Sequence, residues 1–185
     1  MAQLGFMTFS ILRAPYGDAL VQEFDDRTPD VFREAEHAPG FIARAKAVDG
    51  DEWKTNHQRD WGIWGPFAVP RFYLGGIAQG HSTQAQTLSI WADLASVWHF
   101  AYRGQLHRSA LQDRSQWFKQ QNWPIYCAWW IADHHQPTWG EACTRLEHLH
   151  DHGATPYSFT LRRIFAPDGT AVGMEALRFS SIKNQ

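Results

Sequence analysis

A histidine in the middle of a long predicted helix is the first residue in this sequence that could do chemistry. His107 has Arg103 four residues before it and Arg114 seven residues after it, so the three share one helical face. A neutral imidazole on an inward-facing helix can bind haem iron or act as a general base. The two guanidinium groups could hold a carboxylate or the propionates of a haem. The alternative is a structural histidine hydrogen-bonded at a dimer interface.

Tyr102 and Arg103 form a second candidate pair, because they occupy the same helical turn. A tyrosine hydroxyl beside a guanidinium loses its proton more easily and can donate a hydrogen bond to a developing oxyanion. The sequence therefore gives this pair a catalytic interpretation beside His107. The alternative is a core tyrosine next to a surface arginine.

Aromatic residues are unusually frequent, with ten Trp, twelve Phe and five Tyr among 185 residues. Trp129 and Trp130 lie in a continuous apolar run that predicts a buried strand, so their side chains point to opposite faces of a sheet. Together with Trp98 they predict an apolar cavity for a planar ligand. Arg114 and Phe118, on the helical stripe of His107, are further expected substrate contacts. The alternative is that these rings fill a core and a dimer interface.

Two other groups of residues are better explained without a site. His148 and His152 lie one helical turn apart and could bind a metal, but a histidine near a helix C-terminus is also favoured by the helix dipole. Cys127 and Cys143 lie in apolar or helical surroundings, and we interpret them as packed thiols. The sequence has no phosphate loop and no GxSxG, CxxC or HExxH motif.

The elements that must position these residues follow from periodicity and turn signals. Thr28 is predicted to cap a helix with Pro29 at its first position, and Gly104 marks a weak point in a second, long helix. The predicted strands are 3–11, 41–48, 87–91, 125–132 and 158–165, and the predicted helices are 25–38, 93–118 and a third that Thr138 caps and Gly153 ends.

Two strand–helix–strand units, 3–48 and 87–131, predict an α+β fold of the ferredoxin-like, split βαβ type in one domain, 1–166. Two helices would cover one face of the sheet. The aromatic other face also needs a cover, commonly the twin sheet of a second copy in a dimeric α+β barrel. The other expected segments are an irregular Trp-rich insertion at 51–83, typical of a functional or mobile loop, a C-terminal helix and strand at 138–165, and a weakly patterned tail at 167–185.

Several sequence segments carry a resemblance to a known family. They are LSIW at 88–91, FAYRGQLHRSALQDRSQWF at 100–118, AWWIA at 128–132, HQPTWGEACTRLEHLHDHGATPYSFTLRRIF at 135–165, the opening QLGFMTFSILRAP and the PGF at 39–41. With these pieces the chain resembles a bacterial family of unknown function in the dimeric α+β barrel superfamily. That superfamily includes cofactor-free monooxygenases, polyketide cyclases, aldoxime dehydratases, and haem enzymes of the chlorite dismutase and dye-decolourising peroxidase types. The resemblance implies the fold and leaves the reaction open.

Composition excludes some partners. A net charge of −2 argues against nucleic-acid binding, which needs a cationic surface. The sequence has no stretch of 18 consecutive apolar residues, so it predicts no membrane span. The first residues lack the basic and apolar segments of a signal peptide, and only two cysteines are present, so we expect a reduced, cytoplasmic homodimer.

These observations favour a small-molecule enzyme that acts on a hydrophobic aromatic or polyene substrate, with oxygenation or a related redox step as the expected reaction. His107 would be the haem ligand or the base, and haem is one candidate cofactor with no cofactor as the alternative. The sequence leaves open a cofactor-free cyclase, isomerase or dehydratase that uses the same cavity. It also leaves open a homodimer that binds a small molecule without catalysis.

Overall fold

The fold is built on a four-stranded antiparallel sheet. The computed structural model describes residues 2–50, 59–73, 83–132 and 134–173. The strands follow the order β2-β3-β1-β4, which is the strand order of a ferredoxin-like split βαβ fold. The sheet strands are β1 (Gln3–Ile11), β2 (Phe41–Arg44), β3 (Gln84–Trp91) and β4 (Tyr126–Ile131). The predicted α+β class is therefore confirmed.

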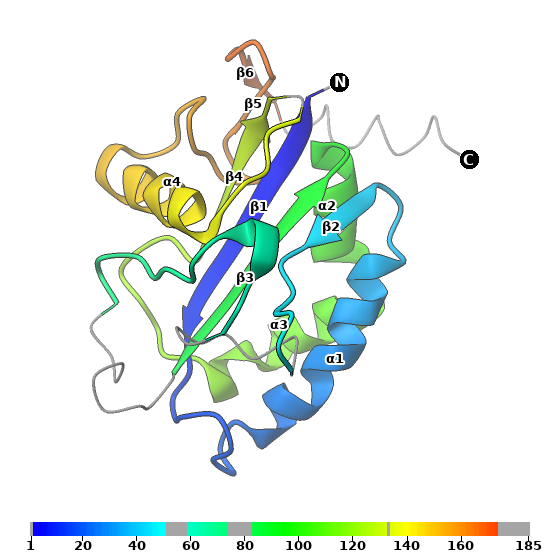
Figure 1. Ribbon diagram of the computed structural model, residues 1–185, viewed down its shortest axis with the longest axis vertical. Coiled ribbons are helices and arrows are strands. Elements are labelled where there is room, and N and C mark those ends of the chain that lie inside the picture. Colours follow the sequence, from blue (N-terminus) through cyan, green and yellow to red (C-terminus); the bar gives the residue numbers. More distant parts are fainter. Residues whose placement is uncertain (1, 51–58, 74–82, 133, 174–185) are drawn as a thin grey trace.

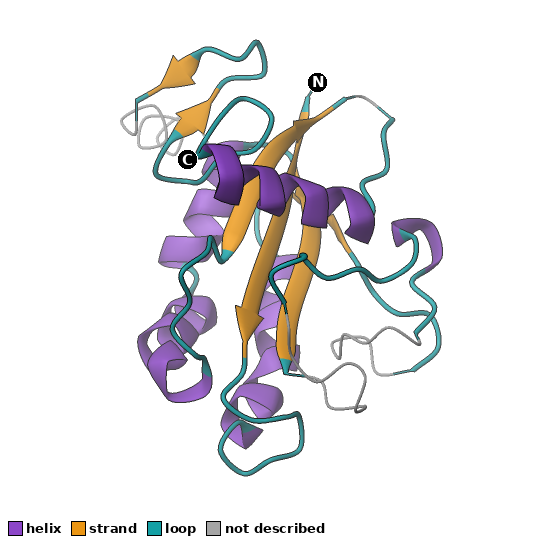
Figure 2. Ribbon diagram, turned by 90° about the vertical axis from the view of Figure 1, so that its left-hand side faces the viewer, coloured by secondary structure: helices purple, strands orange, loops and turns teal. Residues whose placement is uncertain are grey.

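Helices lie on both sides of this sheet. In Figure 1, α4 and the short η1 lie in front of the strands, while α2 and α3 lie behind them. In Figure 2, α4 crosses in front of the strands, the η1 segment lies on one side of them and other helices lie on the opposite side. The helices are α1 (Gln22–Glu36), η1 (Gly62–Trp64), α2 (Leu94–Arg103), α3 (Gln105–Trp117) and α4 (Trp139–His152).

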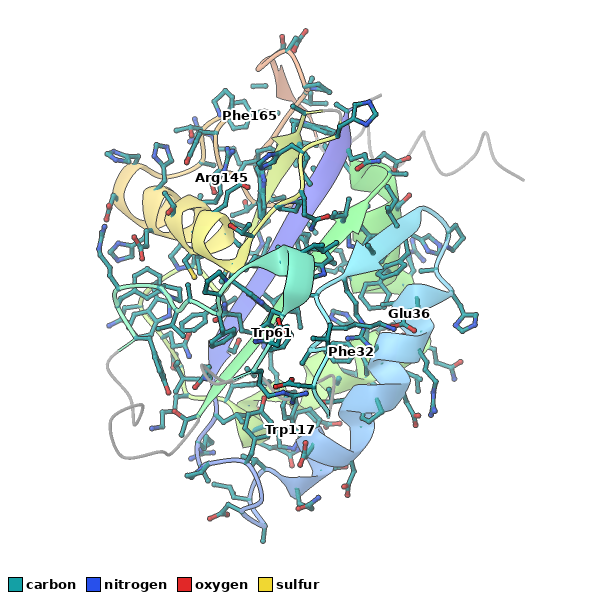
Figure 3. The ribbon with its side chains drawn as sticks, viewed as in Figure 1. Phe32, Glu36, Trp61, Trp117, Arg145 and Phe165 are labelled. Atoms are coloured by element: carbon teal, nitrogen blue, oxygen red, sulfur yellow. The ribbon has the colours of Figure 1, made fainter. Side chains whose placement is uncertain are left out.

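The α4 face, which we define as the side of the sheet packed by α4 and residues 59–73, holds a large cluster of buried side chains. Trp129 is 0% exposed and lies in one cluster with Met7, Phe9 and the apolar side chains of α4. The ring of Trp61 contacts that of Trp139 at a centroid distance of 5.1 Å, and Figure 3 labels Trp61 in front of the sheet. The described part of the Trp-rich insertion is therefore a cover for the core.

This cover corrects the expectation of a closed dimeric barrel. The aromatic face of the sheet was expected to meet the twin sheet of a second copy. Instead, the chain's own α4 and residues 59–73 occupy that face, and the four strands do not close on themselves. A sheet-to-sheet dimer would require both to move away. Residues 51–58 and 74–82, the rest of the predicted insertion, lie outside the described residues.

The α1–α3 face, on the other side of the sheet, is packed at both ends but less completely between them. Leu4, Trp91 and Val97 pack together where α2 covers the sheet, and Leu12 and Trp117 pack together at the other end. Between these clusters, four side chains of the central strands are half-buried, although their sequence neighbours on the α4 face are buried. We call these four residues, Thr8 and Ser10 on β1 and Ala85 and Thr87 on β3, the α1–α3 patch.

The first helix begins earlier than its sequence signals predict. Thr28 is inside α1, where its hydroxyl donates to the carbonyl of Phe24 at 2.7 Å, and Pro29 is also internal. The additional N-terminal turn is held by packing, because the ring of Phe24 contacts Trp117 and Phe118 at 5.9 and 5.1 Å. Tertiary contacts thus override a plausible local cap.

The predicted helix 93–118 is two helices. Gly104 has φ −55° and ψ 131°, which is extended rather than helical backbone, and it separates α2 from α3. Asp93 caps α2 as predicted, since its side chain accepts a hydrogen bond from the Ser96 amide at 2.7 Å. The weak point seen in the sequence is therefore a complete break.

The C-terminal part differs from the predicted strand at 158–165. Only β5 (Ile164–Phe165) is a strand there, and it pairs with β6 (Ala171–Val172). Phe159 forms an isolated bridge to Ala128 at the edge of the main sheet. The folded unit therefore continues past residue 166. Across the described ranges, no helix combines the length and the apolarity that crossing a bilayer requires.

Candidate functional site

His107 lies in the first turn of α3, on the α1–α3 side of the sheet. Its Nδ1 atom lies 3.0 Å from the carbonyl oxygen of Ala101 in α2. A carbonyl only accepts hydrogen bonds, so Nδ1 carries the ring proton and Nε2 carries a lone pair. Among the described residues, Nε2 has no hydrogen-bond partner. This is the arrangement of an imidazole that is ready to bind a metal or accept a proton.

The environment keeps this imidazole neutral. Burial lowers the pKa of His107, and the hydrogen bond to Ala101 and the negative charge of Glu34 oppose that effect without cancelling it. The ring packs against Phe100 at a centroid distance of 4.8 Å. Phe100 in turn stacks on Trp91 at 5.3 Å. The aromatic neighbours thus hold the ring in a partly apolar environment.

Tyr102 is paired with a residue that the sequence analysis did not single out. Burial, together with the neighbouring hydroxyl of Tyr102, raises the pKa of Tyr126 on β4 to about 12. Tyr126 is therefore a neutral phenol at physiological pH. Its position in the predicted strand, two residues before Ala128 and four before Trp130, places it on the face covered by α2.

Arg103 stacks on Trp98, with its guanidinium carbon 5.9 Å from the ring centroid. The ring of Trp98 also contacts that of Tyr102, at 5.6 Å. Trp98 thus joins the two members of the expected catalytic pair. Within the described part of the chain, no hydrogen bond or ring contact connects His107 with Tyr102 or Arg103.

The expected substrate-binding tryptophans do not form one cavity. Trp129 is buried on the α4 face, on the opposite side of the sheet from His107, because side chains alternate along β4. Trp130 is on the α1–α3 face, where its indole N–H donates a hydrogen bond to the carbonyl of Phe165 at 2.7 Å. The expectation that His107 reaches into a chamber lined by Trp129 is therefore corrected.

The two remaining predicted contacts lie along α3 and at its end. Arg114 is exposed. Phe118 is half-buried and packs against Phe24. The structure thus leaves Arg114 accessible to a ligand and uses Phe118 mainly to hold α3 against α1.

The α1–α3 patch includes two hydroxyl groups. The hydroxyls of Thr8 and Thr87 are hydrogen-bonded to each other at 2.6 Å across the two central strands. The aromatic rings of Phe6 and Tyr126, which contact at 5.7 Å, adjoin this pair. The patch therefore places hydroxyl groups next to aromatic rings.

The other candidate groups have structural partners. Nε2 of His148 lies 3.0 Å from the hydroxyl of Thr155, and over the described ranges no group of three or more potential metal ligands occurs. Cys127 and Cys143 are free and buried, and burial raises the pKa of both thiols, that of Cys143 to about 12. These cysteines are therefore protonated packing residues.

Comparison with known proteins places the whole folded unit in one family. Residues 3–175 match the family described as "Domain of unknown function (DUF3291)". Among solved structures, the chain is similar to the NE2512 protein of unknown function from Nitrosomonas europaea. That similarity has 12% identity and a TM-score of 0.43, covering 75% of this chain and 97% of the other. No curated protein matches the chain.

Proposed function

We propose that this chain, which belongs to the DUF3291 family, is a small-molecule oxidoreductase that binds haem through His107. Its substrate would be a hydrophobic aromatic or polyene compound. The single observation that carries this proposal is the orientation of the imidazole. Its Nδ1–H is engaged by the carbonyl of Ala101, and its Nε2 lone pair is left without a partner among the described residues. A ligating histidine needs both conditions.

The donor set fits a haem. A single neutral imidazole suffices as a protein ligand to haem iron, and burial favours the neutral form of His107. Exposed Arg103 and Arg114 offer guanidinium groups of the kind that bind carboxylates such as haem propionates. When bound, haem supplies the activation of oxygen or peroxide that oxygenation requires.

The chain's own residues would set the environment of the substrate. The half-buried rings of Tyr126 and Phe100 would provide apolar contact surface for it. The neutral phenol of Tyr126, beside Tyr102, would donate a hydrogen bond to a substrate oxygen. The Thr8 and Thr87 hydroxyls tolerate water or one polar substituent in an otherwise apolar ligand.

A cofactor-free cyclase, isomerase or dehydratase is the second candidate, and the same lone pair favours it. In that case Nε2 of His107 would act as a general base, which a neutral histidine with a lowered pKa can do. We also keep the homodimer and the cytoplasmic location as expectations. The homodimer is supported by the exposed apolar side chains of Val48 and Ile63, and the cytoplasmic location by the two free thiols.

The test is an absorption titration of the purified protein with haem. The wild-type chain is expected to give a saturable Soret shift, and His107→Ala is expected to lose it. The matched control is His99→Ala, which removes an exposed histidine from the neighbouring helix α2. Saturable binding with all three proteins would exclude His107 as the ligand. A colourless protein that takes up no haem would remove the haem-dependent form of the proposal and leave the acid–base form.

A further inference from the structure

A carboxylate from another helix holds the start of α3. The two side-chain oxygens of Glu34, in α1, accept hydrogen bonds from the backbone amides of Leu106 and His107 at 3.1 and 3.0 Å. These contacts span more than seventy residues of sequence. One carboxylate thus connects α1 directly to the residue that carries the candidate site.

This contact replaces a local helix cap. The first amides of a helix have no intrahelical partner and need an acceptor. Gly104 precedes α3 and has no side chain to supply one. A Cβ atom at Gly104 would lie 2.6 Å from the carbonyl oxygen of Phe100 and 3.1 Å from an oxygen of Glu34. Gly104 therefore leaves room for the carboxylate, which the positive end of the helix dipole also favours.

The same break determines where the imidazole of His107 can bond. In a continuous helix, the carbonyl of Ala101 would accept a hydrogen bond from the amide of Gln105. The extended backbone at Gly104 ends α2 before that bond can form, and the last amide bonded into α2 is that of Gly104, which donates to the carbonyls of His99 and Phe100. The carbonyl of Ala101 is thereby available to Nδ1 of His107.

We propose that Glu34 is the positioning residue of His107. By capping α3 from α1, it holds the break at Gly104 in the geometry that directs Nδ1–H of His107 to Ala101 and leaves Nε2 bare. This inference rests on the proposed function in one respect, namely that His107 is the residue that holds the ligand. Its geometric content, the tautomer of His107, can be measured without any ligand.

The experiment is long-range ¹⁵N–¹H NMR of the imidazole rings in the full-length protein without added haem, at a pH where the ring of His107 is neutral. The wild-type ring should show protonated Nδ1 and unprotonated Nε2. Glu34→Ala should lose this signature and give the exchange-averaged pattern of a free imidazole. Glu34→Gln keeps one acceptor oxygen and should retain only part of the signature. If the alanine variant does not fold, this partial loss is the result that supports the proposal.

The matched control is Asp30→Ala, which removes a carboxylate from the same helix, where Asp30 forms an exposed ion pair with Arg33. Loss of the signature in Glu34→Ala but not in Asp30→Ala supports the proposal. An unchanged signature in Glu34→Ala, or equal loss in both variants, overturns it. Haem titration of the same proteins separates the two proposals. A tautomer that depends on Glu34 in a protein that takes up no haem supports the positioning role and contradicts the haem-binding function.

Discussion

The two faces of the sheet differ in how completely their side chains are buried. On the α4 face, alternate side chains of the central strands are buried under α4 and residues 59–73, and the rings of Trp61 and Trp139 contact each other edge to face. On the α1–α3 face, the same strands present Thr8 and Thr87, which are only half-buried. Along this part of the strands, side-chain alternation thus places the more completely buried residues on the α4 face.

The difference shows that an abundance of tryptophan does not by itself mark a ligand cavity. Buried tryptophans close both faces: Trp61, Trp129 and Trp139 lie on the α4 face, and Trp91 and Trp117 lie on the α1–α3 face. Polar side chains also occur on both faces, since Gln86 is buried on the α4 face. What distinguishes the α1–α3 face is His107, a neutral imidazole whose Nε2 atom has no hydrogen-bond partner among the described residues.

The largest expected effect is on stability when a tryptophan is removed from the packed face. Trp129→Ala should lower the free energy of unfolding by about 3–5 kcal/mol, because a fully buried indole is replaced by a cavity. Trp98→Ala, on α2, should cost less than half as much, since Trp98 is partly exposed. Urea denaturation of both variants measures this, and equal losses would contradict the contrast between the faces.

Adding atoms tests the same contrast from the opposite direction. A Cβ atom on Gly5 would lie 2.5 Å from the indole ring of Trp129, so Gly5→Ala should destabilise the protein by about 1–3 kcal/mol through overpacking. Thr87→Leu adds volume to the α1–α3 face and should change stability by less than about 1 kcal/mol, because solvent already reaches that side chain.

The Thr87→Leu substitution should also weaken haem uptake, since it changes the α1–α3 patch. Thr8 would lose its hydroxyl partner, but water can replace the hydrogen bond at a half-buried position. If Thr87→Leu destabilises the protein as strongly as Gly5→Ala, the α1–α3 patch is as tightly packed as the α4 face.

The smallest expected effect is a pH dependence of stability in the ligand-free protein. Burial lowers the pKa of folded His107 below its ordinary value of 6.5. As the pH falls below 6.5, the unfolded chain therefore takes up a proton that the folded chain resists, and the free energy of unfolding decreases until the lowered pKa is passed. His107→Gln should remove this part of the decrease.

The control for the pH measurement is His99→Gln, which changes an exposed histidine on α2. Denaturant unfolding at several pH values between neutrality and mild acid gives the two profiles. A wild-type profile that His107→Gln leaves unchanged would show that the ring is not held in the neutral form.

The sequence was sufficient for the features that depend on local chemistry. Alternating and continuous apolar runs predicted the four strands of the sheet, although not the short β5 in place of a strand at 158–165. Asp93 and Thr138 were identified as helix caps, and the side chains of both accept hydrogen bonds from the expected backbone amides. The hydroxyl pair of Thr8 and Thr87 carried no separate signal, because a threonine in a strand is common on any half-buried face.

The features that were missed depend on contacts between distant segments. No local pattern indicates that α4 and residues 59–73 would cover the face expected to bind a second sheet. Nothing near Glu34 indicates that its carboxylate caps a helix that begins at residue 105. Pro29 was predicted at the first position of the helix. It lies inside α1 instead, because the packing of Phe24 on Trp117 holds an additional N-terminal turn. Gly104 was the one local indication of the break that positions His107.

The central claim, that the site is built around the Nε2 atom of His107, is tested most directly by chemical rescue. His107→Gly removes the imidazole and leaves space for a free one in solution. The account predicts that this variant loses the Soret shift on haem addition and regains it when imidazole is supplied, whereas His99→Gly behaves as wild type. Wild-type haem binding by His107→Gly without imidazole would contradict the account.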